Sequence, residues 1–446
     1  MIATGTRDAL ELAVPESRSA PSERHWDDGA QMVGVEDVLE RILAAVSPLP
    51  ARQLPILDAL GLVLAEDVIA DVDVPPFRNS AMDGYAVRAI DTIGASIERP
   101  VSLRVIGSLA AGAMPTAEVR DGTVIRIMTG APLPEGADTV VRFEQTNQGR
   151  CHHTIDAPQS AFVAVTSAVR PLENVRPAGE DVAKGTTALT AGTRLRPPEI
   201  GLLAALNRAE VAVHPRPSVA ILSTGDEIAK VGPSLRPGQI RGANTYLLST
   251  MVRSWGGEAI RCGISSDAPD DVRRRLATAR NADLVVTSGG VSHGDYDTVK
   301  QVLRYEGTID IWQVRMKPGK ALASGTLGST PFLGLPGNPV AAAVSFTQFG
   351  RPAILKMLGR RDLIMPTIEA TSVERIVNDG RRRHFVRAIV DGTARDGYTV
   401  RVAGDQGAGV MTSLVRANGL LVIPEDVEVV EPGMRVSVQM TDWDGE

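Results

Sequence analysis

The sequence predicts a multidomain protein of α/β plus β class. A three-layer α/β domain follows mixed and β-rich N-terminal segments and precedes a small C-terminal β-barrel or sandwich. The chain has 446 residues, more than one hydrophobic core supports. Strands and helices alternate after Pro217, which favours a mainly parallel sheet with helices on both faces. On either side of this stretch, short β-branched runs alternate with Gly and Pro turns.

The N-terminal third begins with a polar, irregular stretch. Residues 1–30 are predicted to be a disordered tail. Residues 35–46 carry apolar side chains at helical spacing and predict an amphipathic helix. A second helix is predicted over residues 56–61, with Gly61 at its end. Between residues 71 and 198, runs such as TVIRIM and DTVVRFE predict small β-rich units.

The α/β domain is read from runs of strand and helix character. Its predicted strands are SVAILSTG, EAIRCGI, ADLVVTSGG, IDIWQV and PFLGL. Its predicted helices cover residues 244–255, 270–280 and 296–305, and a long helix runs from Pro339 to about residue 358. From about residue 365 to the end, short alternating strands return, which predicts the C-terminal β domain.

Composition narrows the class of protein. Apolar residues make up 43% and charged residues 22%, as in ordinary globular proteins. The net charge of −6 and the lack of a long basic run argue against nucleic acid binding. No apolar run approaches the roughly 20 residues of a membrane span. The chain shows no apolar signal core and has two isolated cysteines, so we expect a cytoplasmic protein without a disulfide framework.

The segment Cys151-His152-His153 is a possible metal-binding motif. Neighbouring side chains of an extended segment point to opposite faces, and no second ligand pair occurs elsewhere in the chain. A surface strand or loop is therefore the favoured interpretation.

Four strand ends of the α/β domain lead into loops of similar chemistry. The loops are Ser223-Thr224-Gly225-Asp226-Glu227, Thr287-Ser288-Gly289-Gly290-Val291-Ser292 with Asp295 and Asp297 beyond it, Lys317-Pro318-Gly319-Lys320, and Leu335-Pro336-Gly337-Asn338-Pro339. Glycines let backbone N–H groups approach an anion, and a helix N-terminus adds a favourable dipole. The carboxylates would repel that anion unless a divalent cation such as Mg²⁺ joined them. Each loop alone is an ordinary turn, but together they favour a site for a phosphate-bearing ligand and a metal.

Further motifs make the pattern specific. In order along the chain they are Pro75-Pro76-Phe77, Asn79-Ser80-Ala81-Met82-Asp83-Gly84-Tyr85-Ala86, Arg126-Ile127-Met128-Thr129-Gly130-Ala131-Pro132 and Gly179-Glu180-Asp181, followed by the four loops above. This ordered set resembles the molybdopterin molybdenumtransferase family of MoeA type, which includes the E domain of gephyrin. The resemblance runs from about Val35 to the C-terminus.

The resemblance implies a domain organisation and an activity. An N-terminal domain of residues 31–77 and 176–216 would mediate dimerisation and carry an inserted β-rich domain, residues 78–175. A pterin-binding α/β domain would cover residues 217–363, and a β domain residues 364–446. Such proteins are homodimers with shared active sites. They insert molybdate into adenylylated molybdopterin with Mg²⁺, release AMP, and complete the molybdenum cofactor. A molybdopterin adenylyltransferase is the implied donor of the substrate.

The resemblance also implies roles for individual residues. The implied catalytic residues are Asp83, Thr129, Glu227, Asp297 and Lys317. The implied pterin-binding residues are Thr224, Gly225, Asp226, Ser288, Gly289, Gly290, Ser292, Lys320, Pro336, Gly337 and Asn338. The implied metal-binding residues are Asp181, Glu227, Asp267 and Asp297. We hypothesise that Asp297 and Glu227 hold Mg²⁺ or orient the attacking oxygen, and that the lysines bind molybdate or phosphate oxygens.

Several of these residues have simpler explanations. Asp83 precedes a glycine and can merely shape a turn, and Thr129 can cap one. Asp181 can belong to a surface ion pair, and Asp267 can be the N-cap of the following helix. Lys320 can be an ordinary exposed lysine.

The chain departs from the family pattern at four positions. Arg78 and Gly242 stand where many members have Asp, Gln313 where lysine is common, and His293 where Val is usual. These departures keep a second hypothesis open, namely a pterin-binding scaffold or storage paralogue with weakened catalysis. A third is a different nucleotide hydrolase on a related α/β domain, which would not need the motifs around Asp83 and Thr129.

Overall fold

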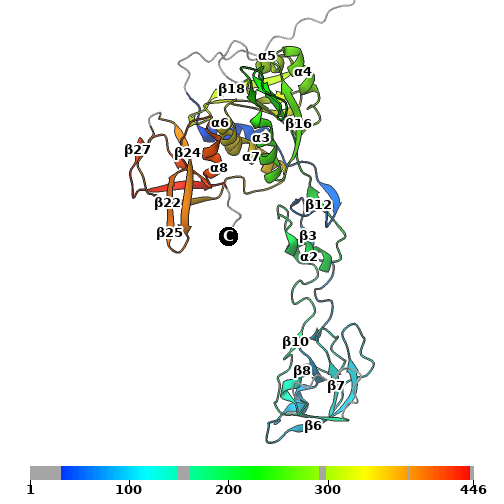
Figure 1. Cartoon of the computed structure of the whole chain (residues 1–446). Helices are drawn as coiled ribbons and strands as arrows, with labels where there is room; N and C mark the ends of the chain where they lie inside the picture. The colour runs from blue at the N-terminus through cyan, green and yellow to red at the C-terminus, as the bar shows by residue number, and fades with distance from the viewer. Residues whose placement is uncertain (1–31, 149–160, 291–297, 379–380, 442–446) are drawn as a thin grey trace, which may run out of the picture.

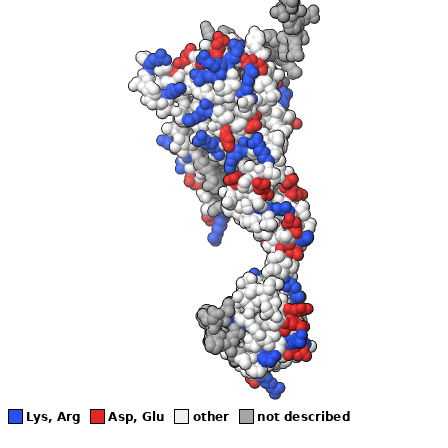
Figure 2. Space-filling view, turned by 90° about the vertical axis from the view of Figure 1, so that its right-hand side faces the viewer, with Lys and Arg blue, Asp and Glu red and all other residues white. Residues whose placement is uncertain are grey.

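The computed structural model describes residues 32–148, 161–290, 298–378 and 381–441. The molecule is elongated, with a large lobe at one end, a β-rich unit at the other, and a small unit between them (Figure 1). On the face drawn in Figure 2, basic and acidic side chains are interspersed over the large lobe, and acidic side chains gather along one edge of the β-rich unit. In the part of the chain described, no helix is long and apolar enough to cross a membrane.

The large lobe contains a six-stranded sheet. Its strands, in spatial order, are β16 (Glu258–Ser265), β13 (Ser218–Thr224), β17 (Leu284–Ser288), β21 (Thr330–Leu335), β20 (Ala321–Leu327) and β18 (Gly307–Gln313). The first four strands pair in parallel, and β20 and β18 add an antiparallel edge. The predicted mainly parallel sheet is therefore confirmed.

Helices cover both faces of this sheet. They are α1 (Val35–Ala44), α3 (Ala243–Ser254), α4 (Pro269–Ala277), α5 (Thr298–Glu306), α6 (Pro339–Ser345) and α7 (Arg351–Met357). The side chains of β13 alternate between two cores. Val219 and Ile221 pack in the core that includes α1, α3, α6 and α7, whereas Ala220 and Leu222 pack in the core of α4 and α5. This alternation produces the three predicted layers.

The first helix, α1, joins the large lobe. Its buried side chains Val35, Val38 and Ile42 repeat at helical spacing and pack in the same core as α7. Val33, just before the helix, bridges to Val314 beside the end of β18. The domain division drawn from the resemblance had placed these residues in the N-terminal unit. The apolar face of the helix finds its partner on the α/β lobe instead.

Two helix predictions differ from the structure. Residues 56–61 form turns after β1 (Arg52–Pro55), so the predicted short second helix is wrong. The N–H groups of Ile56 and Gly61 donate to the carbonyl oxygens of Ala209 and Leu195 in other segments, which takes these donors out of a helical pattern. The long helix after Pro339 is divided into α6, a π-helical turn at Phe346–Gly350, and α7. Pro352 has no N–H to donate to the residue four positions earlier, which interrupts the α-helical pattern there.

The middle unit is built from short elements. β1, β12 (Glu210–His214) and β2 (Val63–Leu64) form one sheet, and β3 (Val68–Ile69) pairs with β11 (Thr187–Leu189). Helix α2 (Pro197–Ala205) packs over them through Leu203. The chain segments before and after the β-rich insertion therefore share one hydrophobic core.

The β-rich unit holds a five-stranded sheet. In spatial order its strands are β8 (Thr139–Arg142), β5 (Gly84–Val87), β7 (Thr123–Ile127), β6 (Val101–Leu109) and β9 (Phe162–Val165), with short 3₁₀ turns at Ala89–Thr92 and Phe143–Gln145. The two segments that join this unit to the rest of the chain pair with each other. β4 (Asn79–Ser80) runs antiparallel to β10 (Val175–Arg176), and Val74 bridges to Val182.

The C-terminal unit is a closed β-barrel rather than a sandwich. Its strands are β22 (Thr367–Ser372), β24 (Arg383–Thr393), β25 (Gly397–Val402), β26 (Gly419–Ile423) and β28 (Arg435–Met440). The pairings run from β24 through β25, β22, β28 and β26 back to β24. Helix α8 (Met411–Arg416) and the short pair β23 (Ile376–Val377) and β27 (Val429–Val430) accompany it. A two-residue strand of the large lobe, β19 (Met316–Lys317), pairs with β24 and attaches the barrel.

Candidate active-site cleft

A cleft of about 550 Å³ opens at the carboxyl ends of β13, β17 and β21. This edge of a parallel sheet is where ligands of such folds bind. The predicted site residues that line the cleft are Thr224, Gly225, Glu227, Asp267, Ser288, Gly289, Gly290, Pro336, Gly337 and Asn338. Three of the four predicted loops therefore meet in one place. The short pair β14 (Ile228–Ala229) and β15 (Ile240–Arg241) forms a further wall.

Glycines bring the backbone close together at the floor of the cleft. Gly289 and Gly290 have φ values of 93° and 70°, which residues other than glycine rarely adopt. A Cβ on Gly289 would lie 2.8 Å from the carbonyl oxygen of Thr224, and one on Gly290 would lie 2.7 Å from Cγ2 of Val299. These residues are glycine because neighbouring atoms leave no room for a side chain, which is a stronger requirement than a turn imposes.

Asn244 joins three loops and was not among the predicted site residues. Its Nδ2 donates to Oγ of Ser288 at 2.6 Å and to the carbonyl oxygen of Gly337 at 2.7 Å, and Ser288 donates to the carbonyl oxygen of Pro336 at 3.2 Å. The available sequence signal was the position of Asn244 in the first turn of a helix that follows the cleft wall. In this segment the family pattern had marked only Gly242, two residues earlier, as a departure.

Two polar atoms of the cleft are buried without a partner. Within the described residues, neither Oδ1 of Asn244 nor Oγ1 of Thr224 has a hydrogen-bond partner. The two residues are only 8% and 5% exposed. An unpaired buried polar atom costs about 1–3 kcal/mol, so the arrangement indicates groups that a ligand satisfies.

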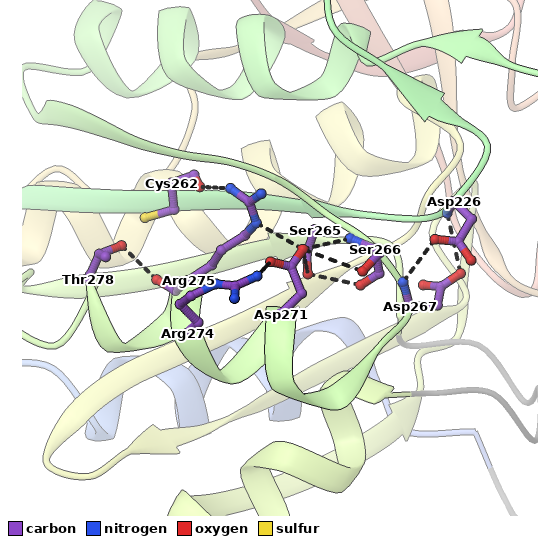
Figure 3. A network of polar contacts seen from close by, with 9 residues as sticks. All are labelled: Asp226, Cys262, Ser265, Ser266, Asp267, Asp271, Arg274, Arg275 and Thr278. Atoms are coloured by element: carbon purple, nitrogen blue, oxygen red, sulfur yellow. Dashed lines mark hydrogen bonds and ion pairs between the residues drawn. The ribbon is translucent and has the colours of Figure 1, made fainter. Parts of the chain in front are cut away.

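Acidic side chains lie at the mouth of the cleft. The N–H of Asp226 donates to Oδ2 of Asp267 at 3.4 Å, and the N–H of Asp267 donates to Oδ1 of Asp226 at 3.2 Å (Figure 3). Asp226, Asp267 and Glu227 are exposed, and the Glu227 carboxylate lies against Gly225. The loops that follow β13 and β16 are thus tied to each other at the point where their carboxylates face solvent.

The predicted metal-binding residues are only partly brought together. Glu227 and Asp267 share the cleft, whereas Asp181 follows β10 near the β-rich unit, with its N–H bonded to the carbonyl oxygen of Val74 at 3.0 Å. Asp297 lies outside the described residues, as do Ser292, His293 and the Cys151-His152-His153 segment. Among described residues, no group of three or more His, Cys, Asp or Glu side chains could hold a metal ion.

The two predicted lysines flank the cleft instead of lining it. Lys317 is half-buried in β19, which pairs with Arg383 and His384 of the barrel. Lys320 is exposed and immediately precedes Ala321, which does line the cleft. Gln313 is the strand partner of Ala321, so this departure position also lies beside the cleft.

Asp83 and Thr129 form a pair of their own. Oδ1 of Asp83 accepts hydrogen bonds from the N–H of Thr129 at 2.7 Å and from its hydroxyl at 2.9 Å. Both residues are exposed, and Arg78 is exposed nearby on the same unit. The unit that carries them stands at the opposite end of the molecule from the cleft (Figure 1). Within one chain, the structure does not bring them to Glu227 or Asp267.

A buried arginine connects the barrel to the edge of the cleft. Arg387 is fully buried, donating through Nε to Oγ of Ser413 at 3.1 Å and through Nη2 to the carbonyl oxygen of Gly407 at 3.3 Å. The next residue, Ala408, accepts from the N–H of Val340 at the start of α6. Burial lowers the pKa of Arg387 to about 10. Sequence reasoning missed it, although a lone arginine in the apolar run HFVRAIV was a signal.

Models of known families match the chain over nearly its whole length. The MoeA N-terminal region (domains I and II) matches residues 33–207, a probable molybdopterin binding domain matches residues 220–356, and the MoeA C-terminal region (domain IV) matches residues 369–440. The order of the matches follows the order of the units described above.

Curated relatives match at full length. Molybdopterin molybdenumtransferase 2 of Mycobacterium tuberculosis is 39% identical, over 91% of this chain and 97% of the relative. A molybdopterin molybdenumtransferase of Nostoc is 38% identical, over 91% and 93%. A solved MoeA protein of molybdopterin biosynthesis from Pyrococcus horikoshii is 32% identical, with a TM-score of 0.78 over 93% of this chain and all of that chain. The chain belongs to the family of MoeA-type molybdopterin molybdenumtransferases.

Proposed function

We propose that this protein inserts molybdate into adenylylated molybdopterin and releases AMP, which completes the molybdenum cofactor. The single observation that carries the proposal is the cleft itself, where backbone and buried polar groups lie next to solvent-facing carboxylates. Gly289, Gly290 and the unpaired atoms of Thr224 and Asn244 suit a phosphate-bearing ligand. The reaction breaks a phosphoric anhydride, so charge must be neutralised on the leaving phosphate.

The carboxylates of Glu227 and Asp267 fit a Mg²⁺ ion that a substrate completes. Mg²⁺ is commonly held by one or two carboxylates together with substrate phosphates and water. When bound, the ion would neutralise charge on the anhydride. Asp297 is proposed to act with Glu227, either on the cation or by orienting the attacking oxygen.

The lysines are proposed to bind oxyanions at the side of the cleft. Lys317 and Lys320 belong to the loop between β18 and β20, and this loop ends at Ala321 in the cleft wall. An ammonium group donates charge-assisted hydrogen bonds to molybdate or phosphate oxygens. Lys317 is held in place by its strand pairing with the barrel, so it would present that charge from a fixed backbone.

The remaining implied residues are proposed to come from a second subunit. Asp83, Thr129 and Asp181 lie away from the cleft of their own chain, yet the first two are hydrogen-bonded to each other on an exposed surface. In a twofold dimer each β-rich unit could complete the cleft of its partner, giving two equivalent sites. We further propose a cytoplasmic homodimer supplied by a molybdopterin adenylyltransferase, with the domain boundaries predicted from the resemblance except for α1, which packs on the α/β lobe.

A second candidate function is pterin binding without turnover. Gly242 favours it, because a Cβ at this position would lie 2.8 Å from Cγ2 of Ile228 and 3.2 Å from Cδ1 of Ile264. An aspartate there, as in many relatives of the family, would need these side chains to move. Gly242 therefore supplies no carboxylate to the cleft, and Ile228 and Ile264 leave little room for one.

One assay separates the two functions. The protein is supplied with adenylylated molybdopterin, Mg²⁺ and molybdate, and both AMP release and molybdenum incorporation are measured. The proposed enzyme releases AMP and incorporates molybdenum in equal amounts. Tight pterin binding without AMP release would support a scaffold or storage role instead. AMP release that needs no molybdate, with no incorporation, would support a nucleotide hydrolase.

A further inference from the structure

Asp267 stands in a turn that is hydrogen-bonded on one side to a largely shielded carboxylate, that of Asp271. The turn follows β16 and precedes α4, and it contains Ser265, Ser266 and Asp267. Asp271, in the first turn of α4, points back toward it (Figure 3). Oδ2 of Asp271 accepts hydrogen bonds from the hydroxyl of Ser265 at 3.1 Å, and from the N–H and hydroxyl of Ser266 at 3.0 and 3.4 Å.

The same carboxylate is fixed from its other side. Nε of Arg275 donates to Oδ2 of Asp271 at 3.2 Å, and Arg274 donates to Oδ1. The Asp271 side chain is only 13% exposed. Arg275 also donates to the carbonyl oxygen of Cys262 in β16, so strand, turn and helix share one set of bonds. A shielded carboxylate with several donors is held more firmly than a surface ion pair.

We propose that Asp271 is a positioning residue that sets Asp267 against Asp226 and thereby determines the cation affinity of the cleft. Asp271 restrains the two residues before Asp267, and Asp267 in turn exchanges backbone hydrogen bonds with Asp226. The inference rests on the proposed function, because it takes Asp267 as a cation-binding residue. Residues that orient metal-binding side chains through hydrogen bonds commonly change metal affinity when replaced.

A purely helix-stabilising role is the alternative, since acids in a first helical turn favour the helix dipole. Asp270 provides the matched control. It occupies the same first turn, but its side chain is 94% exposed and bonds to Arg273 on the outer surface of the helix. Asp270→Asn and Asp271→Asn remove the same charge from the same helix end. Only the second weakens the bonds to the turn that carries Asp267, because an amide keeps a single acceptor oxygen where the carboxylate uses both.

The experiment measures Mn²⁺ binding to the full-length protein saturated with AMP, by electron paramagnetic resonance of the free ion, beside the Mg²⁺ dependence of AMP release. We expect Asp271→Asn to weaken Mn²⁺ binding, and to raise the half-saturating Mg²⁺ concentration, by about tenfold. Asp270→Asn should change the Mn²⁺ affinity and the half-saturating Mg²⁺ concentration by less than about twofold. Turnover of Asp271→Asn should recover at saturating Mg²⁺. Ser265→Ala, which keeps every charge, should shift both measures in the same direction by a smaller factor.

A double variant tests whether Asp271 acts through Asp267. In an Asp267→Asn background, Asp271→Asn should add no further loss of Mn²⁺ affinity. An unchanged Mn²⁺ affinity in Asp271→Asn, beside normal wild-type turnover, would overturn the positioning role and leave the proposed function standing. A wild-type protein that binds Mn²⁺ in an Asp271-dependent way but releases no AMP would overturn the proposed reaction and support the positioning role. Equal losses of Mn²⁺ affinity in Asp270→Asn and Asp271→Asn would overturn the positioning role and indicate that both residues only stabilise the helix.

Discussion

Asp83 receives both the backbone N–H and the hydroxyl of Thr129 on a single carboxylate oxygen, at 2.7 and 2.9 Å. Both residues are exposed, and the unit that carries them stands far from the cleft of its own chain (Figure 1). A pair assembled from separate strands and left exposed is suited to contact another molecule.

Mixed dimers should recover activity from two inactive variants. Asp83→Asn and Glu227→Gln remove one charge each and preserve side-chain shape, so each homodimer should fold and be inactive. In a mixed dimer, one cleft receives both substitutions and the other receives neither. Random pairing makes about a quarter of all clefts intact. We therefore expect about a quarter of wild-type AMP release from the unseparated co-expressed protein, and about half from mixed dimers isolated through two different tags. Verified mixed dimers without activity would show that the two residues serve the same cleft from the same chain.

Loss of Lys317 should weaken molybdate-dependent turnover. Lys317→Ala removes a charge-assisted donor, which is worth about 1.5–3 kcal/mol. The measurement is molybdate incorporation as a function of molybdate concentration. Lys184→Ala is the control, because Lys184 is exposed on the middle unit, away from the cleft. Equal turnover of Lys317→Ala and Lys184→Ala at low molybdate would remove Lys317 from the site.

A lysine at position 313 should improve oxyanion capture. Gln313 pairs with Ala321 of the cleft wall, and the family commonly has lysine there. Gln313→Lys adds a positive charge beside the cleft, and an exposed ionic interaction contributes about 0.2–1 kcal/mol. We expect a modestly lower apparent KM for molybdate, with kcat little changed. A KM that stays the same or rises would mean that position 313 does not face the oxyanion in this chain.

Asn244 should be needed to hold the cleft loops together. Asn244→Asp keeps the shape but replaces the Nδ2 donor with an oxygen that faces the carbonyl oxygen of Gly337. Losing a buried hydrogen bond in this way costs about 1–3 kcal/mol. AMP affinity, measured by calorimetry, should fall accordingly. Thermal unfolding measures how far the same substitution lowers the stability of the protein. Thr250→Val, on the exposed face of the same helix, should leave AMP affinity unchanged.

Acid should destabilise the middle unit through Glu199. Hydrogen bonds from the Arg196 side chain lower the pKa of Glu199 to about 2, against the opposing effect of burial. A carboxyl group with a lowered folded-state pKa stabilises the protein above its unfolded pKa near 4.5 and loses that contribution as pH falls toward 2. Between pH 5 and 3, wild-type Tm should fall more steeply than that of Glu199→Gln, by about 2–4 °C for each kcal/mol involved. Parallel curves would show that Glu199 contributes nothing to acid sensitivity.

Local patterns predicted the framework of the large lobe well. The alternation of strand and helix after Pro217 indicated the sheet, and the loops at strand ends indicated the cleft, because parallel strands place their carboxyl ends at one edge. Contacts between distant segments were harder to predict. The bridging amide of Asn244 and the burial of Arg387 depend on which loops meet in space, and residue types alone do not specify that. The division of the long helix at Phe346–Gly350 similarly depends on one proline within an otherwise helical run.

The paired segments that join the β-rich unit to the molecule determine how that unit can move. Because β4 and β10 are hydrogen-bonded to each other, the two segments that connect the β-rich unit to the middle unit form a two-stranded ribbon, not two separate linkers. A ribbon bends easily across its flat face and resists sliding of one strand past the other. The exposed Asp83 and Thr129 should therefore travel along a narrow arc as one body. In the proposed dimer, this restriction would keep the Asp83–Thr129 pair aligned with the cleft of the other subunit.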